Sequence, residues 1–287
     1  MKIDFATINY NTYSHTENFI KSLIESFKFS SKDLNINIYI GDNGPDDQTE
    51  LIKAFIEKIR HKGIFIDVKR LSNNGYFGTL NDLLTLNNLN NSDALILGNN
   101  DIIFKKDYIL NLETLILSSD KFKDSFCFVP RVETENKFDD NPRFEKKYPL
   151  SKFFIQRISY SSFLIFQVIN KIKKLKLIFK RIFIKNRLEP LNDKKVKRIF
   201  LPVGVQFIFI NPPFSYRLPK KTFLYGEESF ISMQALENYK YIYHYPKLHI
   251  FHSVSASVSF KSLYIRWKLL KQSFTINREF LRNESIK

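Results

Sequence analysis

The chain has 287 residues, of which 44% are hydrophobic and 15% aromatic, enough to build a sizeable core and to exclude global disorder. A single cysteine, Cys127, excludes an intramolecular disulfide and fits a reducing compartment. The formal net charge is +16, but residues 143–200 carry most of it, with 17 Lys/Arg against 3 Asp/Glu. The remaining chain is nearly neutral, so the overall charge does not by itself indicate a nucleic-acid-binding protein.

The first hundred residues alternate between strand-like and helix-like patterns. Strands are predicted at residues 3–8, 36–40, 64–68 and 94–97, where apolar residues alternate or run together. Helices are predicted at 19–27, 51–59 and from residue 80 onward, where apolar residues recur at helical spacing. Units of roughly thirty residues in this order predict a parallel sheet with crossover helices. The N-terminus has no apolar core typical of a signal peptide, and no window longer than 18 residues is free of charge, so no membrane-spanning helix is expected.

Polar residues follow each predicted strand directly. They are Asn9, Tyr10 and Asn11 after the first strand, Asp42 and Asn43 after the second, Asn73 after the third, and Asn99, Asn100 and Asp101 after the fourth. Because the carboxyl ends of parallel strands share one edge of a sheet, we expect these side chains to form one ligand site. The alternative is that they are turn formers that merely end the strands.

No glycine-rich phosphate motif of the dinucleotide or Walker type is present. A nucleotide bound at this edge would therefore need another group to neutralise its phosphates. We expect a divalent metal, Mg²⁺ or Mn²⁺, held by oxygen ligands from Asp101 and Asn99.

Five short motifs occur in an order that resembles the inverting family 2 glycosyltransferases of the GT-A fold, in particular their rhamnosyltransferase-like branch. The motifs are INYNT (8–12), IGDNGPDD (40–47), NNGYFGTLN (73–81), FLYGEE (223–228) and HSVSAS (252–257). The resemblance implies an α/β, Rossmann-like, mostly parallel sheet flanked by helices. It also implies a nucleoside-diphosphate sugar as donor and a glycan or lipid-linked oligosaccharide as acceptor.

The resemblance assigns roles to individual residues. Residues implied to bind the nucleotide sugar are Asn9, Tyr10, Asn11, Asp42, Asn43, Asn73, Gly75, Asn81, Asn99 and Asn100. Residues implied to bind the metal are Asp101, Asn99 and His252. Glu228 is implied to be the catalytic base, with Glu227 beside it.

The chain also departs from the family pattern. Asn99 stands where a second metal-binding carboxylate often lies, and Glu228 stands where the base is normally Asp. Residues 215–222 replace a Gly-Gly-Phe-Asp-Glu run. A degenerate protein that binds without transferring is therefore an alternative. Glu227 and Glu228 could instead be an exposed helix start, His252 a structural hydrogen-bonding residue, and Asn73 and Asn81 a turn former and a helix-surface residue.

Residues 163–185 place apolar residues along one helical stripe and basic residues largely off it. This pattern predicts a helix that lies on an anionic membrane surface, and it fits a peripheral enzyme of envelope polysaccharide synthesis on the cytoplasmic face of the membrane. One alternative is a helix packed on its own domain. Another is that the chain is a basic nucleic-acid-binding protein with residues 143–200 as its contact surface. The expected organisation is a donor-binding half (1–142), a basic amphipathic insert (143–200), an acceptor half (201–257) and a C-terminal basic helical segment (258–287).

Overall fold

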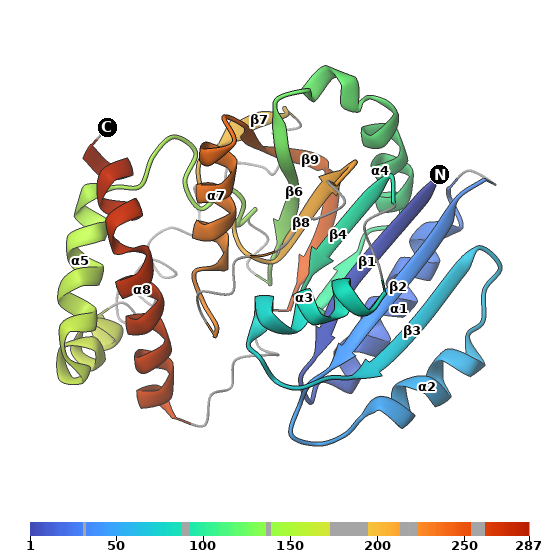
Figure 1. Cartoon of the computed structure of the whole chain (residues 1–287), viewed down its shortest axis with the longest axis horizontal. Helices are drawn as coiled ribbons and strands as arrows, with labels where there is room; N and C mark the ends of the chain where they lie inside the picture. Colours follow the sequence, from blue (N-terminus) through green and yellow to red (C-terminus); the bar gives the residue numbers. More distant parts are fainter. Residues whose placement is uncertain are drawn as a thin grey trace.

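The computed structural model describes residues 1–30, 33–87, 92–135, 139–172, 195–212, 218, 223–253 and 262–286. Within these residues, one mixed sheet runs through the molecule (Figure 1). Its strands are β1 (Lys2–Asn9), β2 (Asn35–Asp42), β3 (Ile64–Arg70), β4 (Ala94–Gly98), β5 (Ile102–Phe104), β6 (Ser125–Glu133), β7 (Lys197–Ile199), β8 (Gln206–Ile210) and β9 (Tyr241–His252). The strand order is β3-β2-β1-β4-β8-β6-β9-β5, and β7 pairs with β9.

The helices are α1 (Tyr13–Phe27), α2 (Thr49–Lys58), α3 (Tyr76–Leu86), α4 (Tyr108–Leu117), α5 (Leu150–Ser161), α7 (Glu227–Glu237) and α8 (Leu263–Ile286). A short 3₁₀ helix, η1 (Ser119–Phe122), follows α4, and residues 163–172 are also helical.

The parallel half of the sheet confirms the expectation from the sequence. β1 pairs in parallel with β2 on one side and with β4 on the other, and β2 pairs in parallel with β3. Beyond β4 the sheet becomes mixed, because β8 runs antiparallel to β4. The helix expected from residue 80 begins earlier, at Tyr76, directly after Gly75.

Helices cover both faces of the sheet, and the alternation of side chains along β1 shows how. Ile3 and Phe5 belong to a core that includes residues of α1, α2 and α4, whereas Ala6 and Ile8 belong to a second core with residues of α3 and α7. Each fully buried large apolar side chain contributes about 1.5–3 kcal/mol. A strand buried on both faces needs a nearly continuous apolar run, which β4 shows, whereas β1 also buries the polar residues Asp4, Thr7 and Asn9.

A third, smaller core joins α5 and α8 at the end of the molecule away from β3 (Figure 1). Phe153 of α5 lies 5.6 Å from Phe274 of α8, measured between ring centroids. The single helix expected over 163–185 is only partly described. Helical residues 163–172 follow α5 after a break at Ser162, which is extended, and residues 173–185 lie outside the described residues. No helix in the described part of the chain is long and apolar enough to cross a membrane.

Candidate active site

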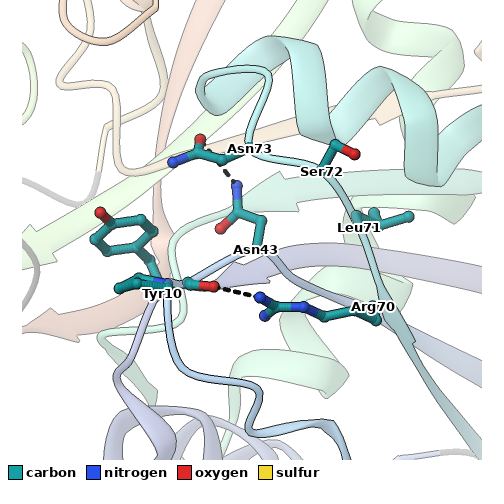
Figure 2. A pocket seen from close by; sticks show the side chains of 8 residues that line it. Tyr10, Asn43, Arg70, Leu71, Ser72 and Asn73 are labelled. Carbon is teal, nitrogen blue, oxygen red and sulfur yellow. Dashed lines mark hydrogen bonds between the residues drawn. The ribbon is translucent and has the colours of Figure 1, made fainter.

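The loops that follow β1, β2 and β3 enclose a pocket of about 470 Å³. It is lined by Tyr10, Asn43, Gly44, Pro45, Arg70, Leu71, Ser72 and Asn73, and Figure 2 shows the ring of Tyr10 on one side and Asn43 and Asn73 on another. Three polar strand ends therefore meet at one edge, as parallel topology requires. The lining side chains are neutral or basic, so the pocket suits a ligand that is polar, aromatic or anionic.

Asp42 is buried behind this pocket and does not line it. Its Oδ1 accepts a hydrogen bond from Asn9 (2.8 Å), and its Oδ2 accepts from the Gln48 backbone N–H (2.8 Å) and from Arg70 Nη1 (3.1 Å). Thr49 adds a further donor at 3.2 Å. Asn9 is equally buried, so both side chains make their contacts within the protein, and their contacts with a ligand stay predictions.

This buried network orients the one basic group of the pocket lining. Arg70 uses its second guanidinium nitrogen to donate to the Gly44 carbonyl oxygen at 2.6 Å (Figure 2). A charge-assisted bond of this kind is stronger than a neutral one. Asp42 therefore holds both the arginine and the loop that follows β2.

Asn43 and Asn73 are placed as the sequence predicted. The Asn43 amide nitrogen donates to Thr79 Oγ1 (2.9 Å) and lies 3.5 Å from the Asn73 side-chain oxygen (Figure 2). Asn43 Oδ1 is buried and accepts no hydrogen bond among the described residues. Because a buried acceptor without a donor is costly, this oxygen favours a ligand that brings an N–H or O–H.

Asn11 supports the pocket loop and does not line the cavity. It has a positive φ of 52° and accepts a hydrogen bond from the Asp46 backbone N–H at 3.2 Å. Gly44 lies so close that a Cβ there would be 2.2 Å from the Asn11 side-chain oxygen, so this position requires glycine.

A second polar region lies where β4 turns into β5. The Asp101 carboxylate is nearly inaccessible, and its Oδ1 lies 3.3 Å from His252 Nε2. The sheet explains this meeting, because Ile102 of β5 is aligned with His252 of β9 in an antiparallel pair. Two of the three expected metal ligands are thus adjacent.

The amides of the same turn have different positions. Asn99 is half-buried, and its backbone N–H donates to the Val205 carbonyl oxygen at 3.0 Å. Asn100 is buried and donates to Thr12 (2.7 Å) and Thr16 (2.8 Å), which ties the turn to the start of α1. Its amide nitrogen is thus used internally, and its contact with the nucleotide sugar stays a prediction.

Glu227 and Glu228 begin α7 after Gly226, as their sequence position suggested, but they are not an exposed helix start. Each is about 8% exposed. Glu228 forms an ion pair and hydrogen bond with Arg143, which belongs to the basic insert. Burial, reinforced by the neighbouring Glu228 carboxylate, raises the pKa of Glu227 to about 8. Glu227 therefore keeps its proton near neutral pH.

Tyr76 connects the second polar region to this glutamate pair. Burial raises the pKa of its hydroxyl, and the carboxylates of Glu227 and Asp101 raise it further. Its backbone N–H donates to the Phe223 carbonyl oxygen at 2.9 Å. Gly75, with φ of +77°, lies against the same residue, since a Cβ there would be 2.4 Å from Phe223 O. The NNGYFG and FLYGEE motifs are thus in direct contact.

Asn81 has a structural role in this arrangement. Its side-chain amide donates to the Leu218 carbonyl oxygen (2.8 Å) and accepts from the Leu218 N–H (2.9 Å), so it holds one backbone position. Its contact with the nucleotide sugar stays a prediction.

Sequence reasoning missed Arg70, Arg143, Asp140 and Tyr76. Burial raises the pKa of Asp140, while His252 and Arg143 act to lower it, which places Asp140 near both. For Tyr76 alone the sequence held a signal, because this tyrosine stands where the NNGYFGTLN motif of the family usually has phenylalanine.

No protein-family model and no curated protein matches the chain. Solved structures do. A crystal structure of S. aureus TarS residues 1–349 matches with a TM-score of 0.52 and 13% identity over 99% of this chain and 73% of that one. The same protein in complex with UDP matches with a TM-score of 0.51 and 12% identity over 89% of this chain and 61% of that one.

A crystal structure of GalNAc-T7 with UDP, GalNAc and Mn²⁺ matches with a TM-score of 0.53 and 10% identity over 88% of this chain and 43% of that one. In another TarS structure the chain spans only 37% of the matched protein. These likenesses show that the chain has the GT-A fold, which confirms the fold class expected from the sequence.

Proposed function

We propose that this chain is an inverting glycosyltransferase that moves a sugar from a nucleoside-diphosphate donor to a glycan acceptor. The observation that carries the proposal is a set of buried acidic groups: Asp101 lies 3.3 Å from His252, and Glu227 and Glu228 stand side by side at the start of α7. The carboxylates of Asp101 and Glu227 both raise the pKa of Tyr76. They lie at the edge of the sheet that also forms the pocket, in a fold shared with structures solved with UDP and with UDP-GlcNAc.

The pocket after β1–β3 is the proposed nucleoside site. The half-exposed ring of Tyr10 offers a stacking face for a base, and Asn43 Oδ1 offers an acceptor for a base N–H. Arg70 supplies positive charge at its rim. Asp42 acts indirectly, by holding Arg70 and the loop in place.

Asp101 and His252 are the residues that would hold a divalent metal. Carboxylate and imidazole can both bind Mn²⁺, and Asp101 Oδ1 already lies 3.3 Å from His252 Nε2. The described residues contain no group of three or more His, Cys, Asp or Glu side chains arranged for a metal, so further ligands would come from the donor diphosphate and from Asn99. When bound, the ion would neutralise negative charge on the departing diphosphate.

Glu228 is the proposed base. It takes the proton of the acceptor hydroxyl while the acceptor oxygen bonds to the anomeric carbon and the bond from that carbon to the phosphate oxygen breaks. Arg143 forms an ion pair with the Glu228 carboxylate and holds it in place. Glu227, with a pKa of about 8, keeps its proton at neutral pH and can donate a hydrogen bond.

The finer assignments rest on the order of the motifs and on the basic insert. We propose membership of family 2 and its rhamnosyltransferase-like branch, with a hexose or deoxyhexose as the transferred sugar. The proposed acceptor is a lipid-linked oligosaccharide in cell-envelope polysaccharide synthesis. The proposed location is peripheral, on the cytoplasmic face of the membrane.

The test is thermal stabilisation by a panel of nucleoside diphosphates (UDP, GDP, CDP and dTDP) with and without Mn²⁺. One of them is expected to raise the Tm, and Mn²⁺ is expected to raise it further in the native chain but not in Asp101→Asn. Asp67→Asn, a half-buried carboxylate on β3, is the matched control and should keep the metal effect. Absence of stabilisation by every nucleotide would overturn the proposal, and binding without release of the diphosphate from any sugar donor would indicate a degenerate protein.

A further inference from the structure

A continuous set of large apolar side chains faces solvent on α5 and on helical residues 163–172. On α5 the exposed residues are Phe154, Ile155 and Ile158, and on the following helix they are Leu164, Ile165, Val168 and Ile172. Within each helix most of these positions are three or four residues apart (154/158, 155/158, 164/168, 165/168 and 168/172), so they form a stripe along one side. We call these seven residues the apolar stripe.

The apolar stripe is not the face with which α5 packs on the rest of the protein. Phe153 and Tyr160 of α5 already contact Phe274 of α8, with ring centroids 5.6 and 5.5 Å apart. Figure 1 shows α5 and α8 side by side at the end of the molecule opposite β3. α5 thus has its partner inside the protein, and its second apolar side is left facing outward. This arrangement argues against the alternative in which the insert simply packs on its own domain.

Charge beside the stripe has a single sign. Between residues 150 and 172, the part of this region that the structure describes, the charged side chains are Lys152, Arg157 and Lys171, all basic. On α8, Lys268 lies over the Tyr264 ring (4.8 Å) and Lys271 over the Trp267 ring (4.9 Å). Aromatic rings and lysines with apolar stems are the side chains that prefer the boundary between lipid and water.

We infer that the apolar stripe, with the basic residues beside it, docks on an anionic lipid bilayer. Aliphatic side chains gain free energy from acyl chains, and the basic residues gain from lipid phosphates. A nucleic acid would use the charge but would leave the isoleucines, leucine and valine in water. A second copy of this chain would bring the same positive charge against itself. The bilayer satisfies both features of the surface at once.

The docked surface is also connected to the proposed catalytic loop. A Cβ on Gly226 would lie 2.1 Å from Ser273 Oγ and 2.8 Å from Asn277 Nδ2, so α8 rests directly on the residue before Glu227. If the proposed function holds, attachment through this end places the catalytic glutamates near the membrane, where a lipid-linked acceptor is anchored. The docking itself does not depend on that function.

The experiment is co-sedimentation of the full chain with vesicles of phosphatidylcholine alone or mixed with an equal amount of phosphatidylglycerol, without nucleotide. The first variant is Leu164→Glu/Val168→Glu, whose native side chains are 71% and 55% exposed. The matched control is Leu117→Glu/Leu86→Glu, on α4 and α3, whose native side chains are 77% and 56% exposed. Both pairs are helical and solvent-facing, so neither is expected to alter the fold.

A second pair of variants tests charge. Arg157→Ser/Lys171→Ser removes two exposed basic residues beside the stripe, and Lys58→Ser/Lys62→Ser removes two exposed ones near α2. Each basic residue lost near the surface is expected to weaken partitioning about fivefold.

The expected result is salt-sensitive binding to the anionic vesicles that is lost in Leu164→Glu/Val168→Glu and kept in Leu117→Glu/Leu86→Glu. Equal binding of these two variants, or no binding by the native chain, would overturn the inference. Binding to single-stranded nucleic acid in place of vesicles would also overturn it. So would a dimer of the native chain that is lost in the Leu164→Glu/Val168→Glu variant. Nucleotide stabilisation, measured on the same preparations, separates failure of this inference from failure of the proposed function.

Discussion

Asp42 and Asp101 each lie at the end of a buried parallel strand, on the same edge of one sheet, yet their surroundings differ. Asp42 accepts hydrogen bonds from four protein donors and is sealed behind the pocket. Asp101 faces an imidazole and shares the surroundings of Tyr76 with Glu227. The first region, the pocket with its Asp42 network, has its charge balanced internally. The second, the cluster of Asp101, His252, Glu227 and Glu228, concentrates carboxylates, and we assign the chemistry to it.

If this division is right, the largest loss of rate should come from the acidic cluster. Glu228→Gln keeps the size of the side chain but cannot accept the acceptor proton, so kcat should fall by roughly 10²–10⁴-fold while the Kd for the nucleoside diphosphate stays unchanged. Glu237→Gln, an exposed position at the end of α7, is the control and should keep its rate. An undiminished kcat in Glu228→Gln would move the base to another residue.

Asp101→Asn should have the next largest effect. Loss of the carboxylate beside His252 removes the stronger metal donor, and kcat/KM should fall by roughly 10²–10³-fold without a change in Tm. Titration with Mn²⁺ provides the check, because the variant should need far more metal for half-maximal rate. A variant with the native metal dependence would exclude Asp101 as a ligand.

The parallel half of this molecule could be predicted because its signals are local. Apolar runs such as 94–97 mark strands, and polar residues after them mark the shared edge. Which polar residue faces a ligand is not local. Asn99 and Asn100 are adjacent and chemically identical, yet only Asn100 donates to Thr12 and Thr16, because α1 happens to pack there.

The same limit applies to the second half of the chain. The pairing of β5 with β9 brings His252 to Asp101, but register between distant strands leaves no local pattern. Arg143 was assigned to a basic insert, where a lysine- and arginine-rich sequence indicates a solvated or lipid-facing surface. Its ion pair with Glu228 depends on how the insert returns to the sheet.

Glu227 allows the acidic cluster to be tested through stability. Its pKa of about 8 lies above its ordinary value, so the folded state holds the proton more tightly than the unfolded state does. This contribution is fully present below about pH 4.5 and is lost as pH rises through 8, with a total on the order of 5 kcal/mol. Glu227→Gln cannot ionise, so urea unfolding should show the native chain losing stability relative to the variant between about pH 5 and pH 8.5. Parallel pH profiles for the two proteins would contradict the raised pKa.

Disrupting the Asp42 network should lower the free energy of unfolding more than it lowers the catalytic rate. Asp42→Asn turns an acceptor of four hydrogen bonds into a group whose N–H₂ faces donors, and it leaves Arg70 without its buried partner. We expect unfolding to become easier by about 2–4 kcal/mol. Asp67→Asn, which removes a half-exposed contact with Lys69, should cost less than about 1 kcal/mol. If instead Asp42→Asn keeps the native free energy of unfolding but loses nucleotide binding, the network contacts the ligand directly. The division between the two regions then fails.

The smallest effect is expected at the pocket wall. Tyr10 is 46% exposed and lines the pocket, so its ring adds contact area for a base without supporting the fold. Stacking of a base on an aromatic side chain contributes about 1–3 kcal/mol, so Tyr10→Ala should raise the Kd for the nucleoside diphosphate by roughly 5- to 100-fold with no change in Tm. Tyr10→Phe should restore most of the affinity, because stacking needs the ring and not the hydroxyl. Tyr239→Ala, at a fully solvent-facing tyrosine, should leave the Kd unchanged. Equal Kd values for Tyr10→Ala and Tyr239→Ala would place the base elsewhere and would leave Arg70 and Asn43 as contacts to the ribose or phosphates only.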